Sequence, residues 1–370
     1  MATNSHNNTH NDLPAKVTAC VTGASGFIGS AVAIRFLDLG HSVRLPLRTE
    51  EQARAWRETY GERYKGRIET VLLVKKMDEE GVFEEAVKGC DVVVHAASPV
   101  TFTIERGAEE DILKPAIAGT LSLLNTAKKT KTVKMVVYTS SLSAYTSIRV
   151  LQTTGEEVRL DDDSWNPFTY EEAAKMTDQD GEEIYSASKA LAERTAWEFM
   201  KDPAVGFKLC TFGPSAVLGY NPSPLVKTLK DARSSFALVA GWLWDKKQFP
   251  PHDGKLYRPE FYVSIKSVVD AHVSAALNPA AGGGKRYALS SDRSSIELLV
   301  RAMIKAEPAL ASHFPPVSQE VTKEEQPRGR YRVDASRAER DLGFKYEPFK
   351  DYAAAFAEQV YALAKAGGLA

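Results

Sequence analysis

The 370-residue sequence is poor in several residue types that would suggest a function by themselves. Its three cysteines, Cys20, Cys90 and Cys210, lie far apart in largely apolar surroundings. This spacing argues against a disulfide framework or a cysteine-ligated metal and predicts buried free thiols in a reducing compartment. The seven histidines show no spacing typical of ligands, so we expect no metal site.

The sequence also lacks an excess of charge of one sign and a long apolar run. Its formal net charge of −1 gives no electrostatic reason to expect nucleic acid or an anionic membrane as a partner. No segment approaches the roughly 20 apolar residues that a membrane-spanning helix needs. Residues 1–14 are polar and without the apolar stretch of a secretory signal, so we expect a disordered tail and a cytoplasmic protein.

What the sequence does contain is a regular alternation of apolar runs and helix-like stretches from Lys16 onward. The expected strands cover residues 16–23, 41–47, 68–74, 91–98, 133–141 and 207–219. The expected helices between them cover residues 27–40, 50–64, 80–89, 109–130 and 183–201. This alternation predicts an α/β fold with a doubly wound parallel sheet of the Rossmann type, which binds ligands at the carboxyl ends of its strands.

Beyond Gly219 the pattern loosens into a segment rich in aromatic residues, proline and glycine. We therefore expect a smaller, mainly C-terminal substrate-binding region beside the dinucleotide-binding domain. The expected division is 15–218 mainly Rossmann domain, 219–260 and 280–350 mainly substrate-binding region, 261–279 again Rossmann domain, and 351–370 a C-terminal helix.

The segment "VTGASGFIGS" contains the glycine triplet Gly23, Gly26 and Gly29, between an expected strand and an expected helix. In this context the glycines allow a tight turn, close approach of a pyrophosphate and close packing of helix on strand. Backbone N–H groups at the helix start would bind the phosphates, and the expected contacts include Ser25, Phe27 and Ile28. The alternative is a glycine-rich turn without a ligand.

Two arginines, Arg44 and Arg48, lie on one face of the second expected strand. At the end of that strand an NAD-specific site would carry a carboxylate for the ribose 2′-hydroxyl, and this sequence has none there. A guanidinium at this place suits a 2′-phosphate through bidentate, charge-assisted hydrogen bonds. We therefore expect NADPH/NADP as the cofactor; the alternative for either arginine is a solvated strand end.

In "YSASK", Tyr185 and Lys189 lie four residues apart, so both side chains reach the same helix face. A phenol can protonate a carbonyl oxygen that receives hydride, and an adjacent ammonium would stabilise the phenolate. Lys189 could also hold the nicotinamide ribose. The alternative is a core tyrosine beside a solvated lysine, which the neighbouring motifs disfavour.

Taken together, "VTGASGFIGS", "VVVHAASPV", "KPAIAGT", "VVYTSS" and "YSASK" resemble the extended short-chain dehydrogenases/reductases. More narrowly, the chain is similar to the dihydroflavonol reductase, cinnamoyl-CoA reductase and fungal aldehyde/ketone reductase group over about residues 16–350. The resemblance implies a catalytic triad of Ser141, Tyr185 and Lys189. It also implies cofactor contacts at Lys76, Met77, Ala96, Ala97, Ser98, Pro214 and Val217.

Two positions depart from the family pattern. Lys76 stands where the family usually has an Asp near the adenine, which leaves adenine recognition open. Ser267 replaces another usual Asp at a position that we interpret as structural.

Aromatic residues in and near the irregular region suggest an apolar pocket for an aromatic or hydrophobic carbonyl substrate. The expected pocket residues are Phe102, Ser141, Tyr145, Trp242 and Trp244. Packing of a lid is the alternative for these aromatic residues. We interpret the acidic run 161–163 as a solvated loop with a turn capped by Ser164, and His95 and His272 as structural histidines.

These observations predict an NADPH-dependent reductase of an aldehyde or ketone, and the resemblance implies transfer of the pro-S hydride. The expected partner is a small-molecule carbonyl substrate, and the chain is expected to be a monomer or homodimer. An epimerase or dehydratase of the same superfamily, with a retained dinucleotide, is the first alternative. A catalytically silent, dinucleotide-sensing regulator is the second.

Overall fold

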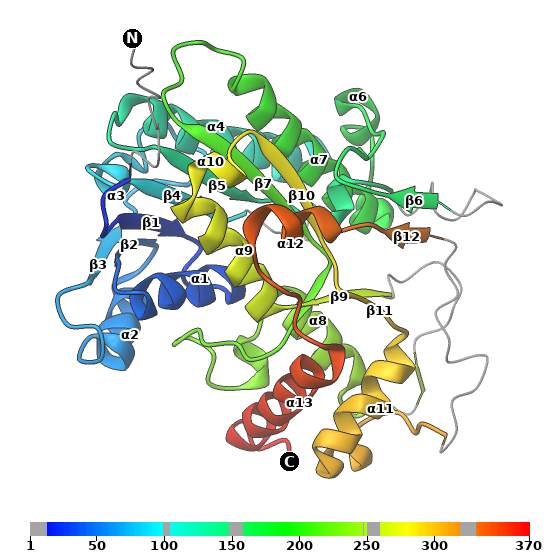
Figure 1. Cartoon of the computed structure of the whole chain (residues 1–370). Helices are drawn as coiled ribbons and strands as arrows, with labels where there is room; N and C mark the ends of the chain where they lie inside the picture. Colours follow the sequence, from blue (N-terminus) through cyan, green and yellow to red (C-terminus); the bar gives the residue numbers. More distant parts are fainter. Residues whose placement is uncertain (1–12, 99–103, 148–157, 247, 250–259, 319–330) are drawn as a thin grey trace, which may run out of the picture.

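The computed structural model describes residues 13–98, 104–147, 158–246, 248–249, 260–318 and 331–370 (Figure 1). Its main sheet has seven strands in the order β10-β7-β5-β4-β1-β2-β3, and all neighbouring strands are parallel. The strands are β1 (Thr18–Thr22), β2 (Ser42–Leu47), β3 (Ile68–Leu72), β4 (Val92–His95), β5 (Met135–Thr139), β7 (Lys208–Pro214) and β10 (Lys285–Leu289). The predicted doubly wound parallel sheet is thus confirmed.

Helices cover both faces of this sheet, as its strands of valine, leucine and alanine require, because such strands are buried on both sides. On one face α1 packs against α9, and on the other α4 packs against α7 (Figure 1). The helices around the sheet are α1 (Phe27–Asp38), α2 (Glu50–Tyr60), α3 (Glu84–Val87), α4 (Lys114–Lys129), α7 (Gly181–Phe199), α9 (Ile265–Leu277), α10 (Pro279–Gly282) and α12 (Ser336–Leu342).

The strand order reverses between β1 and β4. The chain first builds outward from β1 through β2 to β3, then crosses to the other side of β1 and continues through β4, β5, β7 and β10. In open parallel sheets this reversal leaves a crevice outside the carboxyl ends of the strands, where ligands bind. The glycine triplet, the end of β4 and the end of β5 all reach this edge.

A smaller lobe is built on a three-stranded sheet, β11-β9-β8, beside the main one. Its strands are β8 (Ala216–Leu218), β9 (Phe261–Ser264) and β11 (Asp292–Arg293), and its helices are α8 (Ser234–Leu243), α11 (Ile296–Ala306) and α13 (Phe349–Ala366). A separate two-stranded sheet pairs β6 (Val158–Leu160) with β12 (Tyr331–Val333). The short helix α6 spans Tyr170–Ala173.

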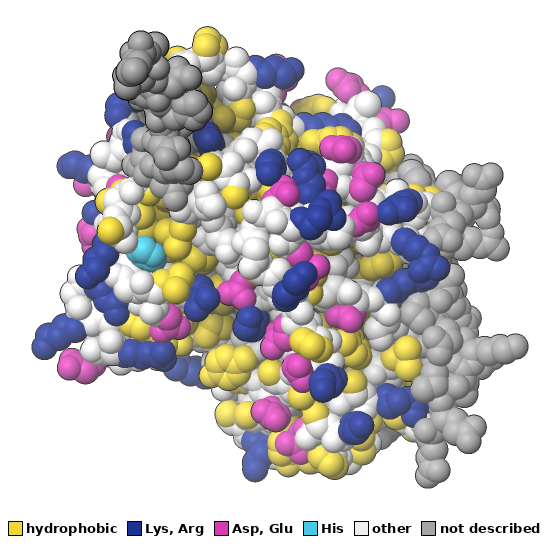
Figure 2. Space-filling model, in the orientation of Figure 1, with side chains coloured by type: hydrophobic (Ala, Val, Ile, Leu, Met, Phe, Trp, Pro, Cys, Tyr) yellow, Lys and Arg dark blue, Asp and Glu magenta, His cyan; other side chains and the backbone are white. Residues whose placement is uncertain are grey.

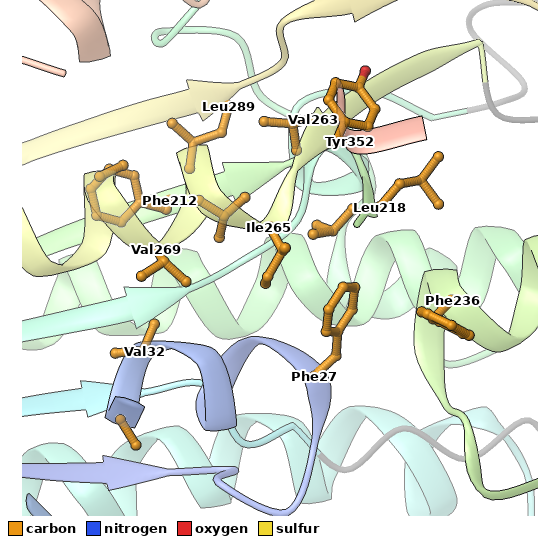
Figure 3. Close-up of a cluster of buried hydrophobic side chains, with 14 of the residues drawn as sticks. Phe27, Val32, Phe212, Leu218, Phe236, Val263, Ile265, Val269, Leu289 and Tyr352 are labelled. Carbon is orange, nitrogen blue, oxygen red and sulfur yellow. The ribbon is translucent and has the colours of Figure 1, made fainter. Parts of the chain in front are cut away.

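The two parts of the fold share one hydrophobic core (Figure 3). Phe27, the first residue of α1, meets Phe236 of α8 edge-on with ring centroids 5.9 Å apart. Phe236 in turn packs edge-on against Phe356 of α13 at 4.7 Å. The helix that follows the glycine triplet is therefore packed directly against the smaller lobe.

The boundary between the two parts differs in detail from the expected ranges. Strand β10 is an edge strand of the main sheet, although it lies in the range 280–350, which was expected to belong mainly to the substrate-binding region. In the range 261–279, β9 belongs to the small sheet and α9 covers the main one. The chain thus crosses between the parts more often than composition alone indicates.

The surface carries no charge asymmetry on the face seen in Figure 2, where Lys and Arg are interspersed with Asp and Glu. Within the described residues, no helix is long and apolar enough to cross a membrane. The three cysteines are buried and free, as predicted.

Candidate active site

The glycine triplet forms a tight turn against the end of β4. Gly23 has a positive φ of +74°, and the Gly26 N–H donates to the Gly23 carbonyl at 2.8 Å. A Cβ on Gly23 would lie 2.7 Å from the Ala97 nitrogen, so this loop touches the segment that follows β4. Gly26 caps α1 without a side-chain hydrogen bond, which leaves the backbone N–H groups of the helix start available to a phosphate.

Replacing Gly29 by Ala should damage this turn. An added Cβ would lie 2.3 Å from the Gly23 carbonyl oxygen, a distance too short for a Cβ contact in a folded protein. We expect dinucleotide affinity to fall and the free energy of unfolding to drop by about 1–3 kcal/mol, as for an overpacked core. Calorimetry with NADPH and thermal unfolding measure both effects.

Gly241→Ala is the matched control, because Gly241 lies in α8 with no heavy atom within 4 Å of an added Cβ. This variant should keep its dinucleotide affinity and gain up to about 1 kcal/mol of stability from better helix propensity. A Gly29→Ala protein with unchanged affinity would contradict the assignment of the turn.

The two arginines of β2 have different environments. Arg48 lies just past the end of β2, its side chain is exposed, and no ion pair or hydrogen bond holds its guanidinium among the described residues. Arg44 lies in mid-strand, opposite Cys20 of β1. Its Nε donates to Glu69 at 2.7 Å and its Nη1 donates to the Lys88 carbonyl.

Arg44 is therefore not available to a 2′-phosphate, and that prediction was wrong. Arg44 and Arg48 do share one face of the extended segment, but side chains on one face lie at different distances from the end of the strand. Only Arg48 reaches the carboxyl edge, so the expectation of a 2′-phosphate contact rests on this residue.

A small cavity lies among the segments that follow β3 and β4, the strand β5 and the helices α4 and α7. Met77, Ala97 and Ser98 line it together with Gly119 and Lys189. The Ala97 N–H donates to the Thr22 hydroxyl at 3.1 Å, which ties this segment to β1. Lys76 is exposed, and its backbone N–H donates to Glu79. Within the part of the chain that the structure describes, no contact of the Lys76 side chain indicates how an adenine would be recognised.

The predicted triad residues come from two elements that meet at the same edge. Ser141 follows β5 and caps a short 3-10 helix, where its hydroxyl accepts from the Ser143 N–H at 3.2 Å. Tyr185, on α7, is half-buried and hydrogen-bonds the Ser141 side chain. Lys189, one turn further along α7, is 4% exposed and its Nζ donates to the Thr139 carbonyl at 3.2 Å.

Burial dominates the protonation of the triad. It raises the pKa of Tyr185, and the hydrogen bond with Ser141 acts in the opposite direction. Burial also lowers the pKa of Lys189 to about 8, although the nearby Glu193 carboxylate raises it. The Lys189 ammonium donates to the Thr139 carbonyl, and its expected lowering of the Tyr185 pKa stays a prediction.

Both histidines are structural, as predicted. His95 bonds the Thr22 hydroxyl at 2.8 Å, and burial lowers its pKa to about 3. His272 bonds the Thr139 hydroxyl at 2.9 Å, and burial lowers its pKa to about 4. Both rings are therefore neutral over the working pH range, and they fix the carboxyl ends of β1 and β5.

The acidic run 161–163 is not a solvated loop throughout. Ser164 and Asp161 exchange hydrogen bonds in a turn, as predicted. Asp162, however, is 6% exposed and accepts from the Ala288 N–H at 2.7 Å. Burial raises its pKa to about 6, against the opposing effect of that hydrogen bond and of Arg337. One member of the acidic run, Asp162, is therefore buried and connects the loop to β10 by a hydrogen bond.

The structure corrects two of the expected pocket residues. Tyr145 is 1% exposed, and the Arg286 guanidinium lies 3.4 Å from its ring centroid, so it belongs to the core. Trp244 stacks on His313 with ring centroids 4.4 Å apart and meets Phe314 edge-on, which agrees with the alternative of a packing role. Phe102 lies outside the described residues, and the same holds for the side chain of Trp242.

The remaining expected cofactor positions lie in the following places in the fold. Pro214 ends β7 at the same edge, and Val217 follows in β8, 3% exposed. The Ser25 carbonyl accepts from the Ser223 hydroxyl at 3.1 Å. Because the Phe27 ring packs into the core, only its backbone N–H could contact a phosphate. Their contacts with a dinucleotide stay predictions.

Sequence reasoning missed a buried ion pair directly behind the triad. Glu193, on α7, is 0% exposed, and its carboxylate accepts from Arg286 Nε of β10 at 2.8 Å. The only signal in the sequence was the position of Glu193 four residues after Lys189, on the same helix face. Nothing local indicates that residue 286 would be its partner, because the two are 93 residues apart.

Comparison with known proteins gives one consistent result. A family model described as the NAD dependent epimerase/dehydratase family matches residues 19–289. The chain is 34% identical to tetraketide alpha-pyrone reductase 1 of Arabidopsis thaliana over 357 residues, which cover 94% of this chain and 97% of that protein. It is 31% identical to aldehyde reductase 2 of Sporidiobolus salmonicolor, covering 72% of this chain and 75% of the relative.

Among solved structures, yeast methylglyoxal/isovaleraldehyde reductase Gre2, complexed with NADPH, superposes with a TM-score of 0.80. The alignment covers 95% of this chain and 100% of Gre2 at 24% identity, which shows a shared fold. The chain therefore belongs to the NAD-dependent epimerase/dehydratase family, and within it to the extended short-chain dehydrogenases/reductases, which use an NAD(P) dinucleotide.

Proposed function

We propose that this protein is an NADPH-dependent reductase that converts an aldehyde or ketone to the alcohol. The observation that carries the proposal is the meeting of Ser141, Tyr185 and a buried Lys189 at the carboxyl edge of the main sheet. The glycine turn opens at the same edge, so a dinucleotide on the turn would bring its nicotinamide toward these side chains.

The residues present fit a dinucleotide. Any side chain at Gly23 or Gly29 would collide with backbone, so the tight turn that would bind a pyrophosphate requires glycine at both positions. Arg48 offers an exposed guanidinium just past the end of β2, where a 2′-phosphate would lie. NADPH, when bound, would supply the hydride for the carbonyl carbon.

The protein's own side chains would orient and protonate the carbonyl oxygen of the substrate. Tyr185 would donate its phenolic proton to the developing alkoxide, and Ser141 would hydrogen-bond the same oxygen and orient it. Lys189 would hold the ribose and provide a positive charge beside the phenolate that forms. The relatives named as an aldehyde reductase and a pyrone reductase support a carbonyl substrate for this site.

Cofactor stoichiometry separates this function from that of an epimerase or dehydratase with a retained dinucleotide. We expect purified protein to consume one NADPH for each alcohol formed and to release the oxidised cofactor. Product analysis by chromatography alongside absorbance at the nicotinamide band tests this. Substrate conversion without net loss of NADPH would favour the epimerase or dehydratase.

The rate should fall on the alkaline side as Lys189 loses its proton. Because burial lowers the pKa of Lys189 to about 8, the active ammonium form is present below that pH and is lost above it. We expect kcat to decline as the pH rises through about 8. A pH profile at saturating NADPH measures this, and a rate that stays constant to about pH 10, the range of an ordinary lysine, would contradict it.

A further inference from the structure

The buried Glu193 carboxylate is held by three side chains from different parts of the sheet. Its Oε2 accepts from the Ser140 hydroxyl at 2.6 Å, and its Oε1 accepts from the Thr211 hydroxyl at 2.6 Å. Arg286 Nε donates to Oε1 at 2.8 Å. These bonds satisfy a charge that would otherwise be costly to bury so close to the reacting edge.

The Arg286 guanidinium continues the network in the other direction. It lies between the rings of Tyr145 and Trp165, with 3.4 and 3.8 Å to their centroids. Its Nη1 donates to the Asp162 carbonyl at 3.0 Å, and its Nη2 donates to the Ala144 carbonyl at 3.3 Å. Only a planar fork of donors can reach carboxylate and carbonyls at once while stacked between two rings.

Together the two residues hold both ends of the turn that carries Ser141. Glu193 binds the Ser140 side chain at the start of the turn, and Arg286 binds the Ala144 carbonyl at its end. Within the turn, the Ala144 N–H donates to the Ser141 carbonyl at 2.9 Å. The ion pair therefore restrains the turn on both sides of Ser141.

Glu193 also acts on the charge of Lys189. The two lie one turn apart on α7, and the carboxylate raises the pKa of the lysine against the effect of burial. The other groups around the pair differ in charge: Arg194 on α7 is a further cation, and Asp162 has a pKa of about 6. Tyr138, Tyr145 and Cys210 have raised pKa values and His95 a lowered one, so all four stay neutral near pH 8.

We propose that the Glu193–Arg286 ion pair is a positioning device for the reaction site, which fixes the turn that presents Ser141 and places a carboxylate one helical turn from Lys189. The inference rests on the proposed function. It makes two separable predictions, one for the geometry of the turn and one for the protonation of the lysine.

The Glu193→Gln variant tests both roles, because the amide keeps the size of the side chain and removes its charge. We expect kcat to fall about tenfold or more and the alkaline limb of the pH profile to move down by about one pH unit. Ser140→Ala removes one hydrogen bond and keeps the carboxylate. It should lower kcat several-fold while leaving the alkaline limb in place.

Asp341→Asn is the matched control. Asp341 pairs with Lys285, the neighbour of Arg286 on β10, at 2.8 Å, and it contacts no triad residue. This variant should be less stable, and it should keep both its kcat and the position of the alkaline limb of its pH profile. If Glu193→Gln folds and behaves as Asp341→Asn does, the pair is merely structural and the proposal is overturned. If Glu193→Gln does not fold, an unchanged kcat in Ser140→Ala overturns it.

The pH dependence of NADPH affinity separates this inference from the proposed function. It requires no carbonyl substrate and should show the same downward shift in Glu193→Gln. If the wild-type protein binds NADPH but reduces no carbonyl, the proposed function fails, and this affinity profile still decides the role of the pair.

Discussion

Replacing Tyr185 by Phe is expected to abolish turnover while leaving the dinucleotide site intact. The substitution removes the phenolic proton that the alkoxide would take, and general acid catalysis of this kind contributes about 10²–10⁴-fold. We expect kcat to fall by about that factor. NADPH affinity should change by less than about threefold, because only one hydroxyl is lost. Steady-state kinetics and NADPH fluorescence titration measure the two effects.

Tyr145→Phe is the control for this experiment. It removes a hydroxyl from another buried tyrosine near the Ser141 turn, and that hydroxyl has no hydrogen-bond partner among the described residues. Its kcat should equal that of the wild type. Retained turnover in Tyr185→Phe would remove the tyrosine from its assigned role, and lost turnover in Tyr145→Phe would return Tyr145 to the substrate pocket.

Replacing Arg48 by Glu should change cofactor preference more than any other single substitution. Charge-assisted hydrogen bonds to a phosphate contribute about 1.5–3 kcal/mol, which corresponds to a factor of about 10–100 in affinity. The new carboxylate would in addition repel the 2′-phosphate and could accept a hydrogen bond from a ribose 2′-hydroxyl. We expect NADPH affinity to fall about 100-fold and NADH affinity to stay constant or rise.

The control for cofactor preference is Arg63→Glu. Arg63 is exposed and pairs with Asp38 at the end of α1, which is the opposite end of that helix from the glycine turn. The ratio of NADPH to NADH affinity should be unchanged in this variant. An equal loss for both cofactors in Arg48→Glu would show that Arg48 does not contact the 2′-phosphate.

The sequence was sufficient to predict the main sheet and the approximate place of the site. Strand–helix alternation and the position of the glycine triplet depend on local patterns, and parallel strands bring their carboxyl ends to one edge. The pairing of Ser141 with Tyr185, which are 44 residues apart, was implied by the family resemblance and not by these patterns, and the structure brings the two side chains into a hydrogen bond.

The errors concern side chains whose partners are distant in sequence. Arg44 was on the expected face of β2, but its partner Glu69 lies on β3, and the pairing register that joins them is not visible in either segment. Asp162 was predicted to be solvated like its two acidic neighbours, because its partner, the Ala288 N–H of β10, is distant in sequence. Tyr145 was predicted to line the pocket because its stacking partner, Arg286, lies 141 positions away and cannot be identified from the local sequence.

The same reasoning explains why the Glu193–Arg286 pair was missed and the irregular lobe could not be interpreted. A buried ion pair is specified by tertiary packing, and its members look like ordinary charged residues in a helix and a strand. In the lobe, Trp244 and His313 stack through contacts between α8 and the segment after α11, where no periodicity indicates which aromatic residues face inward.

The most direct test of the account is consumption of NADPH by the purified protein, compared with NADH, across aromatic, aliphatic and β-dicarbonyl substrates. The account predicts turnover of at least one carbonyl class, with NADPH preferred over NADH. Binding of NADPH without turnover of any carbonyl, or turnover with NADH preferred, would contradict the assignment of this site as an NADPH-dependent carbonyl reductase.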